Sequence, residues 1–153
     1  MTKVSGSHSG GPHSLERAIA IASQAHADQV DKAGQPYILH PLRIMLAVQG
    51  AQERIAAVLH DVVEDTTVTL DDLRGEGFSS EVLEAVDALT KRAGETRLIA
   101  AARAKANRIA RTVKIADVTD NMNLQRIDTP TQKDFDRLKE YDAVKAFPHE
   151  GAR

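Results

Sequence analysis

Residues 59–66, "LHDVVEDT", contain a histidine, two aspartates and a glutamate among three large aliphatic residues. On a helix, positions three and four apart share a face, so Asp61 would lie beside Glu64 and Asp65. His60 would lie beside Glu64. Acidic side chains gathered in this way repel one another unless a cation lies between them, and a divalent metal ion would supply that charge. The alternative is a solvated acidic surface near a helix end, because short motifs often match by chance.

A second histidine stands directly before a proline, in "PYILHPLR", residues 36–43. Proline disfavours the helical conformation of the residue before it and is common at the first position of a helix. We therefore expect a helix that begins at Pro41, with His40 held at its entrance. The positive end of that helix would favour the neutral imidazole that binds metals. A capping or surface histidine is the alternative.

A third polar group lies within "VKIADVTDNMNL", residues 113–124, where Asp117 and Asn121 are one turn apart in an otherwise apolar helix. Lys114 lies one turn earlier. Buried acids are rarely left unpaired. Asp117 is therefore expected either to bind a metal or to form a salt bridge with Lys114 or a neighbouring arginine.

Two histidines and two aspartates from three predicted helices thus form a candidate metal site: His40, His60, Asp61 and Asp117. Two neutral nitrogens and two carboxylates suit a divalent ion and leave positions open for water and substrate. Mixed nitrogen and oxygen ligands are compatible with Mn, Fe or Zn, so the ligand types do not select the metal.

The elements that must position these residues are predicted to be helices. Apolar residues recur at helical spacing from Ser14 onward, and there is no alternating β pattern longer than a few residues. After the helices that begin at residues 14 and 41, the pattern predicts helices over 52–64, 69–75, 80–90, 95–110, 111–124 and 131–147. Thr69 and Asp72 have the spacing of a capping box. The predicted fold is all-α, a single bundle of about seven helices over residues 14–148, with a disordered segment at 1–13 and a tail at 149–153.

Composition narrows the possible functions. The 153 residues are 42% hydrophobic and 27% charged, as in a globular domain, and only 3% aromatic. The net charge of −2 and the lack of a basic tract argue against nucleic-acid binding as the main function. No apolar run approaches the roughly 20 residues that span a bilayer, and the first dozen residues lack a secretory signal. With no cysteine, disulfide and thiolate chemistry are excluded, and a cytoplasmic protein is expected.

Four blocks in order make the chain resemble the HD-domain metal phosphohydrolases. Within them it resembles the (p)ppGpp hydrolase domain of the RelA/SpoT family, especially its small stand-alone hydrolases. The blocks are "AHADQVDKAGQPYILHPLRI", "AAVLHDVVEDTTVTLDDL", "VDALTKR" and "VKIADVTDNMNLQR". The resemblance spans roughly residues 15–147 and implies an HD-domain helical bundle that binds Mn²⁺.

The resemblance also implies a role for each motif residue. The four candidate ligands match the family's metal-binding residues, and Glu64 and Asp65 match its catalytic acid pair. Glu64 would act as general acid or base, while Asp65 would orient water or the surroundings of the metal. The residues predicted to bind substrate are Asn121 and four cations: Lys32, Arg43, Lys114 and Arg126.

The chain departs from the family at two places. Asp31 replaces the arginine of the family's "RKxG" loop, and "GETRLIAAARAK" stands where tyrosines are expected after "TKR". A carboxylate cannot stack on or pair with a nucleotide as arginine does, so the departures concern substrate choice rather than the metal. His26 of "AHADQ" matches a family position, but its apolar helix predicts a packed core histidine.

The predicted function is removal of the 3′-diphosphate from (p)ppGpp, with release of pyrophosphate. A chain of 153 residues has no room for the family's synthetase domain, so a stand-alone hydrolase without synthesis activity is expected. One alternative is the same metal site acting on another nucleotide, such as a nucleotide monophosphate or the phosphate of NADPH. A less favoured alternative is a degenerate HD bundle that binds without catalysis.

Overall fold

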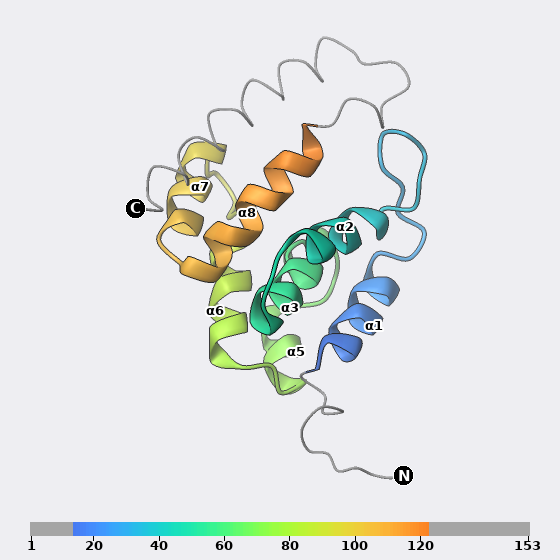
Figure 1. Ribbon diagram of the computed structural model, residues 1–153, viewed down its shortest axis with the longest axis horizontal. Coiled ribbons are helices and arrows are strands. Elements are labelled where there is room, and N and C mark those ends of the chain that lie inside the picture. Colours follow the sequence, from blue (N-terminus) through green and yellow to red (C-terminus); the bar gives the residue numbers. More distant parts are fainter. Residues whose placement is uncertain (1–13, 123–153) are drawn as a thin grey trace.

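The computed structural model describes residues 14–122, and every regular element in that range is a helix (Figure 1). An isolated bridge joins Val30 to Pro36. The all-α prediction is confirmed for these residues, whereas the predicted segments 1–13, 131–147 and 149–153 lie outside them. The helices are α1 (Leu15–Ala25), α2 (Leu39–Ala47), α3 (Ala51–Leu59), α4 (Val62–Asp65), α5 (Leu70–Gly75), α6 (Ser80–Leu89), α7 (Arg97–Lys105) and α8 (Arg108–Asn121).

Helix α3 is the centre of the bundle and contacts α1, α2, α6 and α8. Its last five residues, 55–59, are all buried. Two alanines in this run let neighbouring helices approach closely, and the isoleucine, valine and leucine fill the space between them. His60 follows directly and is only 2% exposed. The central helix therefore delivers an ionisable side chain into the core.

The local signals for helix starts are confirmed at α1 and α5. Ser14 accepts a hydrogen bond from the Arg17 N–H at 3.3 Å and so caps α1. Thr69 and Asp72 form the predicted capping box, with their reciprocal hydrogen bonds at 3.0 and 2.9 Å. Each bond satisfies a backbone donor that has no partner within the helix.

The predicted start of the second helix is wrong, because α2 begins at Leu39 and includes His40. The Leu39 N–H donates to the Pro36 carbonyl at 3.2 Å, and the His40 N–H donates to the Tyr37 carbonyl at 2.9 Å. These bonds wind the chain into the helix before the proline. Pro41 then lies in the first turn, where its missing N–H would have had no intrahelical partner.

The predicted helix over 52–64 is interrupted, because α3 ends at Leu59 and α4 begins at Val62. At the break, the His60 N–H reaches back only to the Ala57 carbonyl, at 3.4 Å. Asp61 has φ −102° and ψ −1°, at the edge of the helical region. Successive side chains of an unbroken helix diverge by about 100°. The break lets the adjacent His60 and Asp61 side chains meet instead.

The predicted helix over 95–110 is also divided. Helix α7 ends at Lys105, and Asn107 caps α8 by accepting a hydrogen bond from the Ala110 N–H at 2.9 Å. Helix α8 then continues without interruption through Asp117 to Asn121. Asparagine favours helix caps because its short side chain bonds the backbone, a signal that apolar periodicity alone does not contain.

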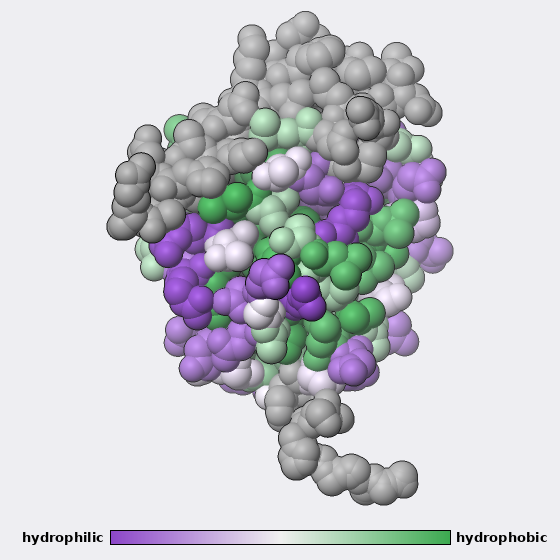
Figure 2. Space-filling model, viewed as in Figure 1, coloured by the Kyte–Doolittle hydropathy of each residue, from purple (hydrophilic) through white to green (hydrophobic). Residues whose placement is uncertain are grey.

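Hydrophobic and hydrophilic side chains are mixed on the face of the molecule shown in Figure 2. Among residues 14–122, the most exposed large apolar residues are Leu46, at 70%, and Val30, at 64%. Scattered apolar residues of this kind are normal on a protein surface. Between residues 14 and 122, no helix has both the length and the apolar character needed to cross a bilayer.

Candidate metal centre

The orientation of His60 is set by the backbone at the end of α3. Its Nδ1 lies 2.6 Å from the Ala57 carbonyl, which can only accept a hydrogen bond, so Nδ1 carries a proton. Nε2 therefore faces the carboxylate oxygens of Asp61, at 3.1 Å, and Asp117, at 3.6 Å. Nε2 is buried and has no hydrogen-bond partner among residues 14–122. In the neutral ring, a lone pair thus points at negative charge.

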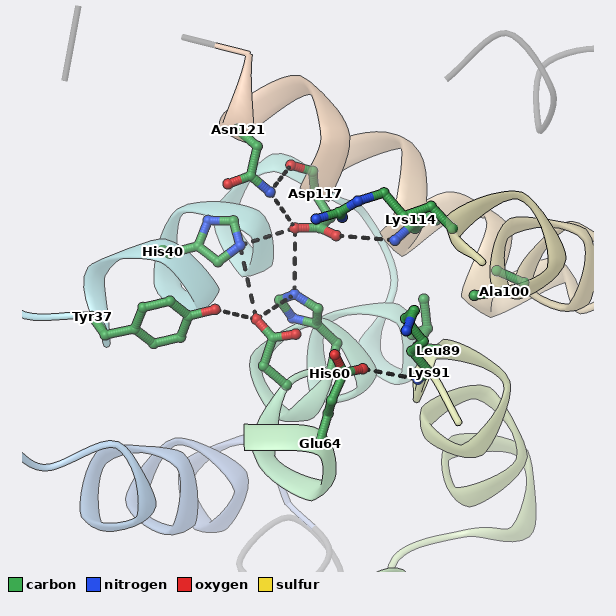
Figure 3. Close-up of a pocket in the computed structure, with 13 residues that line it drawn as sticks. Tyr37, His40, His60, Glu64, Leu89, Lys91, Ala100, Lys114, Asp117 and Asn121 are labelled. Atoms are coloured by element: carbon green, nitrogen blue, oxygen red, sulfur yellow. Dashed lines mark hydrogen bonds and ion pairs between the residues drawn. The ribbon is translucent and has the colours of Figure 1, made fainter. Parts of the chain in front are cut away.

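His40 is oriented in a similar way from α2. Its Nδ1 lies 2.6 Å from Oδ2 of Asp120, and its Nε2 lies 2.9 Å from Oδ1 of Asp117 and 4.0 Å from Oδ2 of Asp61. The Nε2 atoms of both histidines therefore converge on the same two carboxylate oxygens. Figure 3 shows the imidazoles of His40 and His60 directed toward Asp117.

The donor set fits a divalent ion. The ligand atoms of His40, His60 and Asp61 lie within 4.8 Å of one another, and Oδ1 of Asp117 lies close to both imidazoles. An ion at about 2.0–2.2 Å from nitrogen and oxygen ligands separates adjacent ligands by roughly 3 Å. The observed separations of 2.9 to 4.0 Å between imidazole and carboxylate atoms are of that size. These residues would hold the metal.

The charges of the site favour a cation at this position. Burial acts to lower the pKa of His60, but the carboxylates of Asp61 and Asp117 outweigh it, and the pKa lies well above its usual value. Burial likewise acts to raise the pKa of Asp117, but the two imidazoles hold it well below its usual range. The carboxylates therefore attract positive charge, which a proton or a divalent ion can supply.

Two neighbouring side chains hold the carboxylates in place. The Tyr37 hydroxyl donates a hydrogen bond to Oδ2 of Asp61, and Nδ2 of Asn121 donates one to Oδ1 of Asp117 at 3.0 Å. Burial and the charge of Asp61 raise the pKa of Tyr37, so the phenol keeps its proton and remains a donor. Sequence reasoning assigned no role to Tyr37, although it lies three residues before His40 in the quoted motif.

A cavity of about 230 Å³ opens onto the convergent atoms. Glu64 lines it from α4, and its Oε1 accepts a hydrogen bond from the Lys91 N–H at 2.8 Å. Lys91, Arg97 and Lys114 bring positive charge to the same cavity, and Nζ of Lys114 lies 3.6 Å from Oδ2 of Asp117. Figure 3 shows Glu64 and Lys114 on different sides of the histidines. The cavity thus brings together a candidate metal site, the Glu64 side chain and three cations from the described residues.

The predicted site residues are only partly brought together. The cavity is lined by His40, His60, Asp61, Glu64, Lys114, Asp117 and Asn121, together with Lys91 and Arg97, which sequence reasoning missed. Asp65 and Lys32 do not line it, and Arg43 lines a different groove and pairs with Asp120. Arg126 lies outside the described residues. Charge alone identified candidate cations, but it could not tell which of them face the cavity.

Two other predicted residues have structural contacts. Oδ1 of Asp31 accepts hydrogen bonds from the N–H groups of Ala33 and Gln35, both at 2.9 Å, and so closes the loop between α1 and α2. His26 is 2% exposed and its Nδ1 lies 2.9 Å from Oε1 of Gln29, as expected of a packed core histidine.

The carboxyl group of Asp65 has a raised pKa. Partial burial, with the charges of Asp61 and Glu64, raises the pKa of Asp65 to about 6.

Known proteins with similar sequences come from several bacteria. A Mycobacterium leprae protein named probable GTP pyrophosphokinase is 38% identical over 140 residues, which cover 82% of this chain and 17% of that protein. A Borreliella burgdorferi protein named guanosine-3′,5′-bis(diphosphate) 3′-pyrophosphohydrolase is 39% identical over 82 residues, covering 51% of this chain and 12% of that protein. This chain therefore spans less than a fifth of the length of either relative.

A solved structure of a similar fold is described as a metazoan orthologue of SpoT that hydrolyses ppGpp. It matches 95% of this chain and 88% of its own chain with a TM-score of 0.72 and 22% sequence identity, which shows a shared fold. The sequence profile of the HD domain matches residues 18–121, a range that includes all four candidate ligands. The chain belongs to the HD-domain family.

Proposed function

We propose that this chain is a metal-dependent phosphohydrolase that removes the 3′-diphosphate of (p)ppGpp and releases pyrophosphate. One observation carries the proposal: Nε2 of both His40 and His60 converges with two partly buried carboxylates in a cavity that is also lined by an acid and three cations. A degenerate binding module has no need of that combination. The names of the similar proteins support a guanosine polyphosphate as the substrate.

The metal centre would be formed by His40, His60, Asp61 and Asp117, and we propose Mn²⁺ as the ion. When bound, a divalent ion lowers the pKa of a coordinated water toward neutrality and offsets charge on a phosphate oxygen. The donor set is also compatible with Fe or Zn. Metal analysis of protein purified without added ions, followed by reactivation with single metals, identifies the ion.

The chain's own residues would divide the remaining work. Glu64 lines the cavity and can take a proton from the attacking water or give one to the leaving group. Its hydrogen bond from the Lys91 N–H fixes the carboxylate beside the metal site. Lys91, Arg97 and Lys114 would neutralise the phosphates, because cations gathered in a partly enclosed cavity interact strongly with anions.

The relatives carry names of two different activities, a pyrophosphokinase and a pyrophosphohydrolase. The site geometry favours hydrolysis for this domain. A candidate metal position beside the Glu64 carboxylate is suited to activate water, whereas synthesis would require a second nucleotide next to the first. The proposed nucleotide substrate implies a cytoplasmic location, in agreement with a chain that contains no cysteine.

The proposal is tested by a panel of phosphorylated nucleotides incubated with the purified protein and Mn²⁺. We expect ppGpp to be converted to GDP and pyrophosphate, with slower or no release of phosphate from nucleotide monophosphates and NADPH. A protein that leaves ppGpp intact but cleaves another of these nucleotides contradicts the alarmone assignment and keeps the metal phosphohydrolase. A protein with no turnover and no bound metal contradicts both.

Substitution of Asp31 should separate a charge effect from a loop effect. Asp31→Asn keeps an oxygen for the two loop hydrogen bonds and removes the negative charge, so we expect a modestly lower KM for ppGpp and an unchanged kcat. Asp31→Arg should lower KM further but destabilise the protein by about 1–3 kcal/mol, because both loop bonds are lost. Lys32→Ala should raise KM.

Steady-state kinetics with Mn²⁺ and denaturant unfolding of the same four proteins measure the two effects. A higher KM for Asp31→Asn than for wild type would mean that the Asp31 charge assists binding, contrary to this prediction.

A further inference from the structure

Asp120 lies on α8 and contacts two residues of α2. Its Oδ2 is 2.6 Å from Nδ1 of His40, and its two oxygens accept hydrogen bonds from Nε and an Nη of Arg43 at 2.9 and 3.0 Å. The Asp120 side chain is 12% exposed. The bidentate pair leaves the carboxylate little freedom to rotate, so its position relative to the imidazole is well determined.

The contact determines which nitrogen of His40 keeps a proton when the other nitrogen binds a metal. Both ring nitrogens face a carboxylate, which can only accept a hydrogen bond: Nδ1 lies 2.6 Å from Asp120 and Nε2 lies 2.9 Å from Asp117. A metal bound at Nε2 would take the place of a proton on that atom, so the remaining proton of the neutral ring would lie on Nδ1 and be donated to Asp120. Without Asp120, the neutral ring could place its proton on Nε2 and donate it to Asp117, which would block metal binding.

The two histidines are oriented by different means. For His60, the acceptor of the Nδ1 proton is the backbone carbonyl of Ala57, at 2.6 Å. For His40, the acceptor is the side chain of Asp120. A substitution therefore removes the partner of His40 without changing that of His60, which makes the effect of orientation measurable at one ligand.

Asp120 is placed to act through His40 and not on the substrate. It does not line the cavity above the metal site; instead it lines a separate groove between α2 and α8, of about 670 Å³, together with Arg43. We propose that Asp120, clamped by Arg43, is a positioning residue that fixes the tautomer and orientation of His40 for metal binding. The inference rests on the proposed metal centre and assigns it a carboxylate–histidine–metal arrangement.

The competing explanation is that Asp120 only joins α2 to α8. Such a structural role would lower the free energy of unfolding but leave the metal affinity of the folded protein unchanged. The pair of Arg17 and Glu76 offers a matched control, because its guanidinium also bonds both oxygens of a carboxylate on another part of the fold, at 2.8 and 2.9 Å, away from the site.

The test compares Mn²⁺ binding by wild type, Asp120→Ala, Asp120→Asn and Glu76→Gln, measured by the electron paramagnetic resonance of the free ion. Loss of an outer partner of a ligand histidine weakens metal binding by roughly 10–100-fold, and we expect this for Asp120→Ala. Asp120→Asn keeps an oxygen for the Nδ1 proton and should recover most of the affinity. Glu76→Gln should bind as wild type does.

A spectroscopic measurement distinguishes orientation from stability. With Zn²⁺ as a diamagnetic probe, long-range ¹H–¹⁵N spectra should show a protonated Nδ1 and a metal-bound Nε2 for His40 in wild type and Asp120→Asn. Asp120→Ala should lose this pattern for His40 and keep it for His60. Unchanged Mn²⁺ affinity together with an unchanged His40 pattern in folded Asp120→Ala overturns the proposal.

If Asp120→Ala does not fold, Arg43→Gln decides the question. Arg43→Gln removes the guanidinium that holds Asp120 but leaves the Asp120 carboxylate in place. The Mn²⁺ affinity of Arg43→Gln should therefore fall by less than that expected for Asp120→Ala, and an affinity equal to that of wild type overturns the proposed clamp.

Because the measurement is ion binding, failure of the proposed substrate is a separate result. A wild type that binds Mn²⁺ without cleaving ppGpp contradicts the substrate, while the affinity ratio still decides the role of Asp120.

Discussion

Asp61→Ala should abolish both metal binding and hydrolysis. Oδ2 of Asp61 lies 3.1 and 4.0 Å from the two facing imidazole nitrogens, so the substitution removes one of two carboxylate charges that would balance a bound ion. It also leaves the partly buried Tyr37 hydroxyl without its acceptor. With fewer ligands and less negative charge, the site should no longer retain a divalent ion, and the activation of water depends on that ion.

Metal content by mass spectrometry and ppGpp turnover by product chromatography measure this effect. Asp87→Ala is the matched control, since Asp87 lies on α6, is half exposed and pairs with Arg92. The control should retain metal and turnover. Full metal content and normal turnover in folded Asp61→Ala would mean that the assigned site is wrong.

Glu64→Gln should slow turnover by roughly 10²–10⁴-fold, the usual contribution of a positioned general acid or base. The metal should stay bound. Glutamine has nearly the same shape, and its oxygen can still accept the hydrogen bond from the Lys91 N–H. It cannot exchange a proton with water or the leaving group. The loss should therefore appear in kcat, with the KM for ppGpp little changed.

Asp65→Asn is the comparison that tells the two acids apart. Asp65 does not line the cavity, whereas Glu64 does, so we expect its replacement to lower kcat far less. Single-turnover kinetics with excess enzyme keep product release out of the measurement. A near-normal rate for Glu64→Gln with a large loss for Asp65→Asn would reverse the proposed roles.

Much of the fold follows from patterns between residues close in the chain. The caps at Ser14 and Thr69 were predictable because a hydroxyl three residues before a backbone N–H can satisfy it with no help from the rest of the protein. The candidate ligands were recognisable for a related reason. His60 and Asp61 have ionisable side chains and follow an apolar run that had to be buried. Burying an ionisable group without a partner is unfavourable, so both residues were expected to bind something.

The sequence by itself determined the helical class, the approximate extent of most helices and the residues proposed to bind a metal, because each depends on neighbours in the chain. Only the tertiary structure decided the break between α3 and α4 and the partners of the charged side chains. Arg43 was predicted to bind phosphate, but it pairs with Asp120, 77 residues away, and His40 contacts the same carboxylate from a distance of 80 residues. Charge and spacing identify a residue that needs a partner, but the packing of α2 against α8 determines which partner it has. An ion pair forms only between groups that folding brings within reach of each other.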